Sequence, residues 1–474
     1  MPRKSGVLLH ISSLPGDYGI GCLGRGAYGF VDFLAACGFS YWQILPQCMT
    51  NAYHSPYQSP ASFGGNPYFI DLEALFSAGL LTEEELASAK QATPYTCEFE
   101  RLETERLPLL YKAYRRADPV EREAWMKDRP DIRKLCRFLA LRDANKGRPW
   151  QEWSVTEPQD SGFYEFLQAT YFKQWADLRK YANDRGIRII GDLPIYVDLD
   201  SADVWSAPEQ FLLDEKGYPT LVAGVPPDYF CADGQLWGNP LYDWSAMAKD
   251  GFSWWKERIL WAMELYDGVR IDHFRGLESF WGVPADAATA KEGKWYQGPG
   301  MDLIRVIQDA ADGGLVIAED LGDITDEVRA LVEESGFPGM RVLQFAFLSE
   351  GESCHHPHQY PKNTVAYSGT HDNNTLLGYI WELPPDRREH LMDYCGADKN
   401  DWRRACGQII DRLYATAAEL VITPIQDLLA YGGDTRLNRP GEADGNWSYR
   451  VTADQLKELS CEDLLRRNKT YYRQ

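Results

Sequence analysis

Short β-rich runs alternate with longer segments of helical period along the chain, and this alternation constrains the fold more than any other feature. Several runs are almost entirely apolar, as is typical of strands buried on both faces. In 164–182 and 401–417 the apolar residues recur every three or four positions, which predicts amphipathic helices. The candidate strands are 41–45, 68–72, 188–192, 268–272, 315–319, 341–345, 364–368 and 420–425.

Eight strands alternating with helices predict an α/β fold, a closed (β/α)₈ TIM barrel, formed by a single catalytic domain over residues 1–474. A doubly wound open sheet is the alternative. After the last candidate strand about 50 residues remain. A β-sandwich needs about 100 residues, so no C-terminal β-sandwich is expected.

Two intervals do not fit a simple barrel. The interval 76–150 is charged and helical in pattern, with a capping-box spacing at Thr82 and Glu85 and a helix start at Asp118-Pro119. It predicts a helical insertion subdomain between strands 2 and 3. The interval 193–250 lies between strands 3 and 4, is rich in Pro, Gly and aromatic residues, and lacks helical period. It predicts a long aromatic loop that serves as a substrate-loop subdomain.

The charge of the chain restricts its partners. Lys and Arg number 49 against 70 Asp and Glu, which gives a net charge of −21. Such a chain repels phosphate backbones and anionic lipids, so neither nucleic acid nor a membrane is an expected partner. A neutral sugar is not opposed, and the 16 Trp and 27 Tyr include flat rings of the kind that stack on pyranoses.

The N-terminus and the cysteines predict a cytoplasmic protein. The apolar run at 7–11 is too short for a secretory signal, and no stretch is long and apolar enough to span a membrane. The ten cysteines are scattered and form no C-x-x-C pair. We therefore expect reduced, mostly buried thiols.

Acidic residues stand at four of the predicted strand ends. One such residue is commonly only a cap for the next helix. Four on one rim favour an active site, because TIM-barrel active sites gather at the C-terminal ends of the strands. These residues are Asp192, Asp272, Glu319 and Asp372.

Two of these acids are expected to meet a requirement of retaining glycoside chemistry, which uses two carboxyl groups about 5–5.5 Å apart. Asp272 and Glu319 end neighbouring strands, and such strands lie about 4.8 Å apart. Arg270 leaves its strand on the same face as Asp272, where its charge favours the ionised carboxylate. A purely structural ion pair is the alternative. Glu319 follows an apolar run at 316–318, which is compatible with the raised pKa that a general acid needs.

Motifs along almost the whole chain resemble the amylomaltase (4-α-glucanotransferase) family of the α-amylase-like barrels. They occur in the order in which that family has them. They include Ser-Ser-Leu-Pro-Gly, Ser-Pro-Tyr-Gln-Ser, Gly-Asp-Leu-Pro-Ile-Tyr, Gly-Gln-Leu-Trp-Gly-Asn-Pro and Asn-Arg-Pro-Gly, at 12–16, 55–59, 191–196, 234–240 and 438–441.

The resemblance implies roles for individual residues. Asp272 corresponds to the nucleophile, Glu319 to the acid/base and Asp372 to a third carboxylate that holds sugar hydroxyls. Asp192 matches a supporting position below the site, and we include it with the binding residues. The expected substrate-binding residues are Tyr57, Asp192, Tyr229, Phe230, Gln235, Trp237, Asn239, Arg270, His273, His371 and Asn446.

One cluster has the residue types of a zinc site, namely Cys354, His355, His356 and His358. A zinc site needs spaced ligands from ordered elements and usually a fourth partner. The stretch 357–360 matches a family loop without a metal role. We expect no metal and no other cofactor.

The resemblance implies a transferase that moves a segment of an α-1,4-glucan to the 4-hydroxyl of an acceptor glucose or glucan. The reaction would pass through a covalent glycosyl-aspartate. Expected partners are maltooligosaccharides, starch, glycogen and amylose, and the expected state is a monomer or small homo-oligomer. Two alternatives stay open, a hydrolase on the same fold and a catalytically silent glucan-binding protein. The products formed from maltotriose separate the transferase from the hydrolase, and the silent protein should lack an essential carboxylate.

Overall fold

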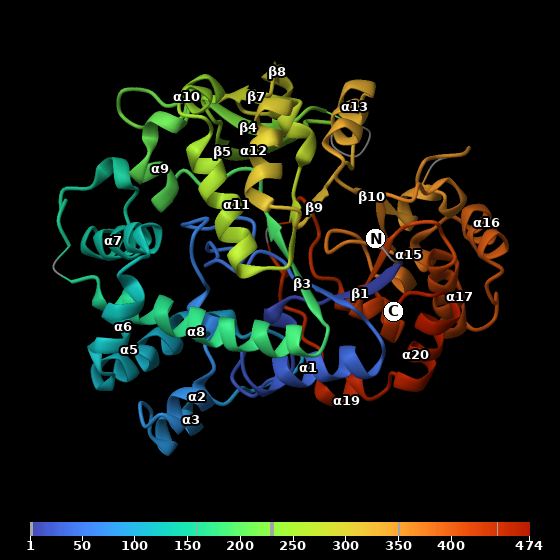
Figure 1. The fold of residues 1–474 in the computed structure, drawn as a ribbon, viewed down its shortest axis with the longest axis horizontal. Coiled ribbons are helices and arrows are strands. Elements are labelled where there is room, and N and C mark those ends of the chain that lie inside the picture. The colour runs from blue at the N-terminus through green and yellow to red at the C-terminus, as the bar shows by residue number, and fades with distance from the viewer. Residues whose placement is uncertain (1–2, 159, 228–231, 349–350, 443) are drawn as a thin grey trace.

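Eight parallel strands form a closed barrel at the centre of the molecule (Figure 1), which confirms the predicted TIM barrel and excludes the open sheet. The computed structural model describes residues 3–158, 160–227, 232–348, 351–442 and 444–474. Strand β12 closes the barrel by pairing with β1, from Lys4 against Leu420 to Leu8 against Pro424. In order around the barrel the strands are β1 (Lys4–Leu8), β2 (Tyr41–Gln43), β3 (Arg188–Leu193), β6 (Gly268–Ile271), β9 (Leu315–Ala318), β10 (Gly339–Val342), β11 (Thr364–Tyr367) and β12 (Leu420–Pro424).

Helices cover the outside of the barrel and bury their apolar faces against it (Figure 1). Both helices predicted from periodicity are present, the first as α8 and the second as α17, which begins after its cap residue Asp401. The covering helices are α1 (Arg25–Ala36), α8 (Gly162–Asp184), α11 (Ser253–Leu265), α12 (Met301–Ala311), α13 (Asp326–Ser335), α15 (Leu376–Glu382), α16 (Pro385–Cys395), α17 (Trp402–Tyr414) and α20 (Cys461–Thr470).

Two predicted strands differ from the structure. Residues 68–72 are not a strand, because Asn66 caps a 3-10 turn at Pro67–Phe69 and Asp71 caps the next helix. The first barrel strand is instead β1, which the sequence pattern does not indicate because Lys4, Ser5 and Gly6 hide its apolar character. The sixth strand was predicted two residues late. Residues 343–345 belong to the short helix α14 (Leu343–Ala346).

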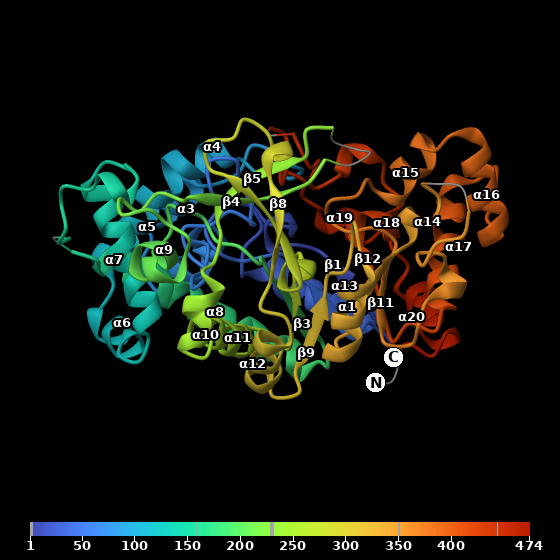
Figure 2. The same ribbon diagram turned by 90° about the horizontal axis from the view of Figure 1, so that it is seen from above.

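The chain between β2 and β3 is largely helical, as predicted. Thr82 and Glu85 form the expected capping box, with each side chain accepting from the other's backbone N–H. Asp118 caps a helix whose first residue is Pro119. These helices lie on one side of the barrel, opposite α16 and α17 (Figure 2). They are α2 (Leu72–Ser77), α3 (Glu83–Ser88), α4 (Phe99–Arg101), α5 (Leu107–Arg116), α6 (Pro119–Met126) and α7 (Pro130–Ala144).

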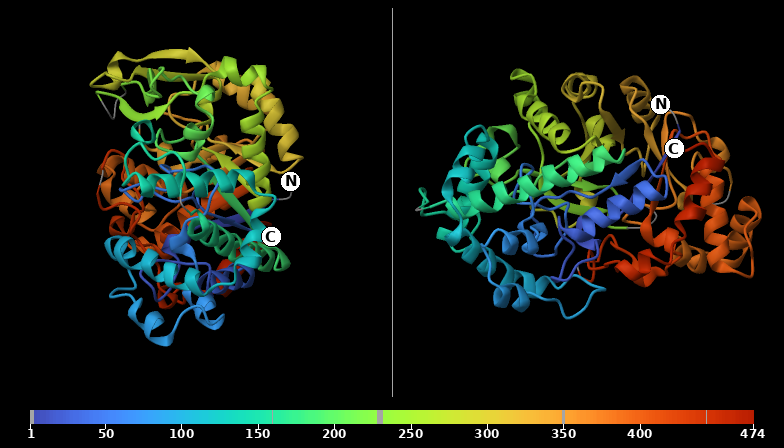
Figure 3. Two further views of the ribbon diagram at one scale, coloured as in Figure 1. Left: turned by 90° about the vertical axis from the view of Figure 1, so that its left-hand side faces the viewer. Right: turned by 60° about the horizontal axis from the view of Figure 1, so that its bottom comes forward.

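The interval 193–250 is more regular than predicted. It contains helices α9 (Ala202–Ser206) and α10 (Trp244–Lys249) and strands β4 (Leu221–Val225) and β5 (Gln235–Pro240). These strands join β7 (Ser279–Pro284) and β8 (Lys294–Gln297) in an antiparallel sheet of order β5-β4-β7-β8. Local periodicity does not show this sheet, because β4 pairs with β7, more than 50 residues further along the chain. The sheet lies to one side of the barrel (Figure 3).

After β12 the described chain is helical or irregular, with α18 (Ile425–Leu429) and α19 (Ala453–Leu456) before α20, so it forms no β-sandwich there. Ser5 near the start of the chain donates a hydrogen bond to Asn468 near its end. Within the described ranges no helix combines the length and apolar character needed to cross a bilayer. The division into one domain with inserted subdomains at 76–150 and 193–250 stays a prediction.

A disulfide joins Cys37, the residue that follows α1, to Cys461, the first residue of α20. This finding contradicts the expectation of reduced thiols for that pair, while the other described cysteines are free. Spacing in the sequence could not reveal the pair, because 424 positions separate the two residues. The bond ties the first barrel helix to the last.

We expect that Cys461→Ser lowers the free energy of unfolding of the protein under non-reducing conditions. A cross-link that closes a long loop restricts the unfolded chain, and its loss costs about 2–4 kcal/mol of unfolding free energy. Urea unfolding with and without a reductant measures this loss. Cys354→Ser, at an exposed free thiol, is the control. Identical midpoints for the wild type in both buffers would contradict the expectation.

Candidate active site

The four predicted acids all lie at the carboxyl ends of barrel strands. Asp192 is the fifth residue of β3, Asp272 follows β6, Glu319 follows β9, and Asp372 lies in the loop after β11. Ile271 pairs with Ala318 across β6 and β9, so Asp272 and Glu319 leave adjacent strands at the same level. The barrel register therefore places Asp272 and Glu319 on neighbouring strand ends, and their catalytic roles stay a prediction.

Arg270 bridges two of these carboxylates. It pairs with Asp192 across β3 and β6, and its Nη1 donates to both oxygens of Asp192 at 2.9 and 2.7 Å. Its Nη2 donates to Oδ1 of Asp272 at 2.7 Å. Arg270 and Asp192 are only 4% and 5% exposed. The planar guanidinium group of Arg270 donates on two sides, and we call it the guanidinium fork. It holds the Asp272 carboxylate in place in a site with little water.

Glu319 is held in a different environment. It is 8% exposed, and its Oε2 and Oε1 accept the backbone N–H groups of His273 at 2.7 Å and Leu321 at 3.0 Å. Burial raises the pKa of Glu319 to about 8, with the charge of Asp272 adding to the rise and Arg270 opposing it. At neutral pH this carboxyl group therefore carries a proton, as a general acid requires.

Asp372 is held by donors on both sides. Its Oδ2 lies 3.3 Å from Nε2 of His371, and its Oδ1 accepts from Nδ2 of Asn438 at 2.6 Å. Nη2 of Arg436 donates to its main-chain oxygen at 2.5 Å. Burial alone would raise the pKa of Asp372, but His371 and Asn438 outweigh burial and hold that pKa below its usual range. Asp372 is therefore an anion at neutral pH.

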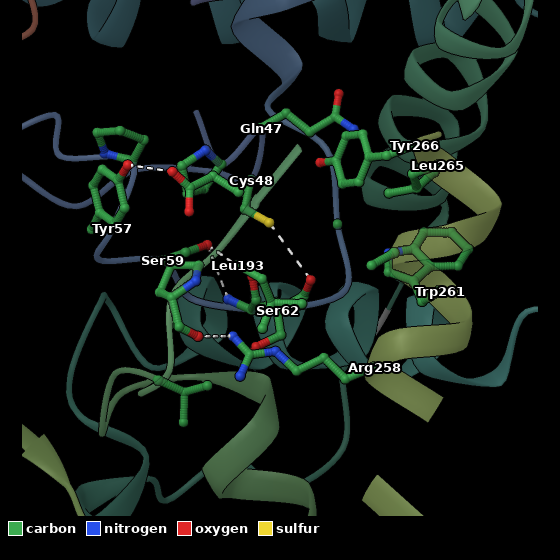
Figure 4. Close-up of a pocket in the computed structure, with 18 of the residues that line it drawn as sticks. Gln47, Cys48, Tyr57, Ser59, Ser62, Leu193, Arg258, Trp261, Leu265 and Tyr266 are labelled. Carbon is green, nitrogen blue, oxygen red and sulfur yellow. Dashed lines mark hydrogen bonds between the residues drawn. The ribbon is translucent and has the colours of Figure 1, made fainter. Parts of the chain in front are cut away.

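Tyr57 connects Asp192 to His371. Its hydroxyl donates to Oδ2 of Asp192 at 2.8 Å (Figure 4) and lies 3.4 Å from Nδ1 of His371. The rings of Tyr57 and His371 are stacked at 4.9 Å, and Trp447 lies 5.9 and 6.0 Å from them. Tyr57 borders a small cavity (Figure 4) of about 50 Å³. Asp192 also lines this cavity. Both oxygens of Asp192 are thus engaged by Arg270 and Tyr57, and its supporting role stays a prediction.

His273 lies beside the nucleophile candidate in a left-handed conformation, with φ of 52°. A non-glycine residue pays a steric cost in that region, and such residues cluster at functional sites. Burial lowers the pKa of His273 to about 4, so its ring is neutral at pH 7. Trp237 of β5 lies 4.8 Å from this ring at an interplanar angle of 79°, and Tyr196 packs near both.

Some predicted binding residues have side chains engaged elsewhere. Asn239 is buried and donates to the main-chain oxygen of Val197 at 3.0 Å. Gln235 is exposed and accepts from the indole of Trp237. Asn446 accepts the N–H of Arg439 and donates to the carbonyl of Glu442, which closes its own loop. Tyr229 and Phe230 lie outside the described residues. A binding role for these five residues, as for the other predicted binding residues, stays a prediction.

The structure brings to the site several residues to which the sequence pattern assigned no role. They come from distant segments, and Tyr196 and Asn438 lie inside family-like motifs, at 191–196 and 438–441. They are Tyr196, Arg436, Asn438 and Trp447.

The histidine cluster at 354–358 has partners of its own. His355 Nδ1 accepts the N–H of Val342, His356 Nδ1 accepts that of Ser353, and His358 Nε2 lies 2.5 Å from a carboxylate oxygen of Glu352. Over the described ranges, no group of three or more His, Cys, Asp or Glu side chains is arranged to hold a metal ion.

Together these contacts give two carboxyl groups on adjacent strands opposite properties. Asp272 is paired with a buried cation, while Glu319 is buried and protonated. That combination is what double displacement at a glycosidic bond requires, one group to attack and one to donate a proton.

A family model described as 4-alpha-glucanotransferase matches residues 9–456. The chain belongs to this family. The 4-alpha-glucanotransferase of Streptococcus pneumoniae is 42% identical over 486 residues, covering 98% of this chain and 96% of that protein. That of Thermus thermophilus is 42% identical over 490 residues, covering 96% of each. The amylomaltase of Streptococcus agalactiae, solved in complex with acarbose, is 36% identical, with a TM-score of 0.95 and 99% of both chains covered.

We expect Arg270→Lys to lower kcat/KM for glucan transfer by about 10²-fold or more, because a small misplacement of a reacting group has that effect. A lysine ammonium cannot reproduce the two-sided fork on Asp192 and Asp272. Initial rates on maltotriose and a thermal melt measure activity and folding separately. Arg329→Lys, at an exposed surface pair with Asp326, is the control. A fully active, folded Arg270→Lys protein would show that the fork is dispensable.

Proposed function

We propose that this protein is a retaining 4-α-glucanotransferase that works through a covalent glycosyl-aspartate. The observation that carries the proposal is the pair of unlike carboxyl groups on neighbouring strand ends, Asp272 on the Arg270 fork and Glu319 with its pKa raised to about 8. Membership of the 4-alpha-glucanotransferase family supports the same chemistry.

In the first step Asp272 attacks the anomeric carbon of the donor glucose, and the bond from that carbon to the linking oxygen breaks. Glu319 gives its proton to the departing 4-oxygen, which leaves as a free hydroxyl on the shortened chain. The glucan fragment is then an ester of Asp272, with inverted configuration. Arg270 stays paired with Asp272 and limits the movement of its carboxylate.

In the second step the 4-hydroxyl of an acceptor glucose attacks the same carbon. Glu319, now ionised, takes the hydroxyl proton, and Asp272 leaves as a carboxylate. The second inversion restores the α configuration, and Glu319 is again protonated for the next cycle. No proton or electron pair remains unaccounted for, and the cycle needs no cofactor.

Asp372, His371 and Tyr57 would bind the donor sugar at the cleavage point. An anion and an imidazole side by side can accept from and donate to neighbouring hydroxyls, and the Tyr57 ring offers a flat face to a pyranose. Such bonds accelerate the reaction where they strengthen as the ring flattens toward the transition state.

Transfer instead of hydrolysis requires that an acceptor sugar displaces water at the intermediate. Trp237, beside His273, supplies an aromatic surface for an acceptor glucose. Tyr229 and Phe230, close to Trp237 in the sequence, are proposed to extend that surface. The substrates we propose are maltooligosaccharides and longer α-1,4-glucans such as starch, glycogen and amylose.

Incubation with maltotriose tests the proposal. We expect a ladder of products both longer and shorter than the substrate, and Asp272→Asn should reduce their formation by about 10⁴-fold, as loss of a catalytic residue typically does. Asp309→Asn, on an exposed position of α12, is the matched control. Glucose and maltose alone would indicate a hydrolase, and a fully active Asp272→Asn protein would exclude Asp272 as the nucleophile.

The pH dependence should report Glu319. A general acid works only while protonated, so kcat/KM for maltotriose should fall as the pH rises through about 8, the pKa of Glu319. With α-maltosyl fluoride the leaving fluoride needs no proton, so initial fluoride release should lose this alkaline decline. Glu319→Ala should likewise retain fluoride release while losing maltotriose cleavage. An unchanged alkaline decline with the fluoride would assign it to another group.

A further inference from the structure

The segment 436–447 comes after the last barrel strand and returns to the active site. Trp447, in a left-handed conformation with φ of 63°, donates its N–H to the carbonyl of Leu437 at 2.6 Å. Its ring is 6% exposed and lies beside Tyr57 and His371. Asn446 ties the loop together through Arg439 and Glu442. The two ends of the segment, which the structure describes over 436–442 and 444–447, are therefore joined beside the active site.

Two residues of this segment contact Asp372 directly, and they also contact each other. Asn438 reaches the carboxylate oxygen Oδ1 at 2.6 Å, and Arg436 reaches the main-chain oxygen at 2.5 Å. Nε of Arg436 donates to the carbonyl of Asn438 at 2.6 Å. The three contacts form a closed unit that holds both the side chain and the backbone of Asp372.

The opposite side of Asp372 is held by its own loop. His371 faces Oδ2, and Thr370 Oγ1 accepts the N–H of Asp372 at 3.3 Å. One carboxylate oxygen is thus fixed by the loop after β11 and the other by the loop after β12. With a partner on each oxygen, the carboxylate has little freedom to rotate about its side-chain bonds.

We propose that Asn438 and Arg436 are positioning residues for Asp372, which hold its carboxylate in the orientation that receives the hydroxyls of the cleaved sugar. The proposal rests on the proposed function, because that orientation matters only if Asp372 binds sugar in the transition state. Asn438 is an uncharged donor, so it orients Asp372 without adding a charge that would compete for the sugar.

Replacing Asn438 by Ala and by Asp tests this role. Asn438→Ala removes the donor, and we expect kcat to fall by about 10- to 100-fold with KM changed less than about 3-fold, because the lost alignment matters most in the transition state. Asn438→Asp places two carboxyl groups at hydrogen-bond distance. Two carboxylates at that distance repel each other. The favourable arrangement is therefore the one in which the two groups share a single proton, and that state is populated only at lower pH.

The pH profile distinguishes positioning from general damage to the fold. We expect the activity of Asn438→Asp relative to wild type to rise about 10-fold or more from pH 8 to pH 5, as the shared proton restores the hydrogen bond. Asn438→Ala should show a loss independent of pH. Arg436→Gln, which removes the contact to the main-chain oxygen, should also lower kcat. Glu442→Gln, at an exposed side chain of the same segment, is the control.

Three results would overturn the proposal while leaving the proposed function intact. These are wild-type kcat in both Asn438 variants, an Asn438→Asp deficit that does not change with pH, and losses that follow melting temperature alone. If the wild type itself gives no ladder from maltotriose, the proposed function fails instead. The two failures are therefore distinguished by the wild-type reaction, which is run beside every variant.

Discussion

The site depends first on one buried cation. Arg270 lies between Asp192 and Asp272 with almost no access to water, where an unpaired guanidinium or carboxylate would be strongly destabilising. Its partners come from two rules of sheet geometry. Asp192 is its neighbour on the paired strand β3, and Asp272 stands two residues on, on the same face of β6. The closed barrel therefore fixes the nucleophile candidate through backbone register, and every other part of the site is arranged around that position.

Environment then separates the remaining acids into different roles. Glu319 sits one strand further round the barrel, where it accepts the backbone N–H groups of His273 and Leu321, and burial raises its pKa to about 8. Asp372 is surrounded by donors on two loops, and these hold its pKa below the usual range despite burial. Asp372 and Glu319, on one rim, thus differ in charge at neutral pH. The hydrogen bonds to the Asp372 anion outweigh the cost of its desolvation, whereas those to Glu319 do not.

The walls of the site come from segments far apart in the chain. Tyr57 follows β2, Trp237 belongs to the small antiparallel sheet, and Asn438 and Trp447 follow the last barrel strand. The barrel brings the ends of its strands together. Each loop therefore starts close to the site, and its local conformation is enough to place one side chain there. The disulfide from Cys37 to Cys461 connects the first and last barrel helices, and so links the two ends of the same closed structure.

Local patterns in the sequence determined seven of the eight barrel strands to within a few residues, the helices α8 and α17, and the caps at Thr82 and Asp118. Spacing on one strand also related Arg270 to Asp272, since alternation along a strand is a local property. The sequence could not reveal the pairing of β1 with β12, the pairing of β4 with β7, the disulfide or the contact of Asn438 with Asp372. Each of these joins residues that are far apart in the chain. Periodicity and capping report only the nearest few residues, whereas closure of the barrel decides which distant loops meet at its rim.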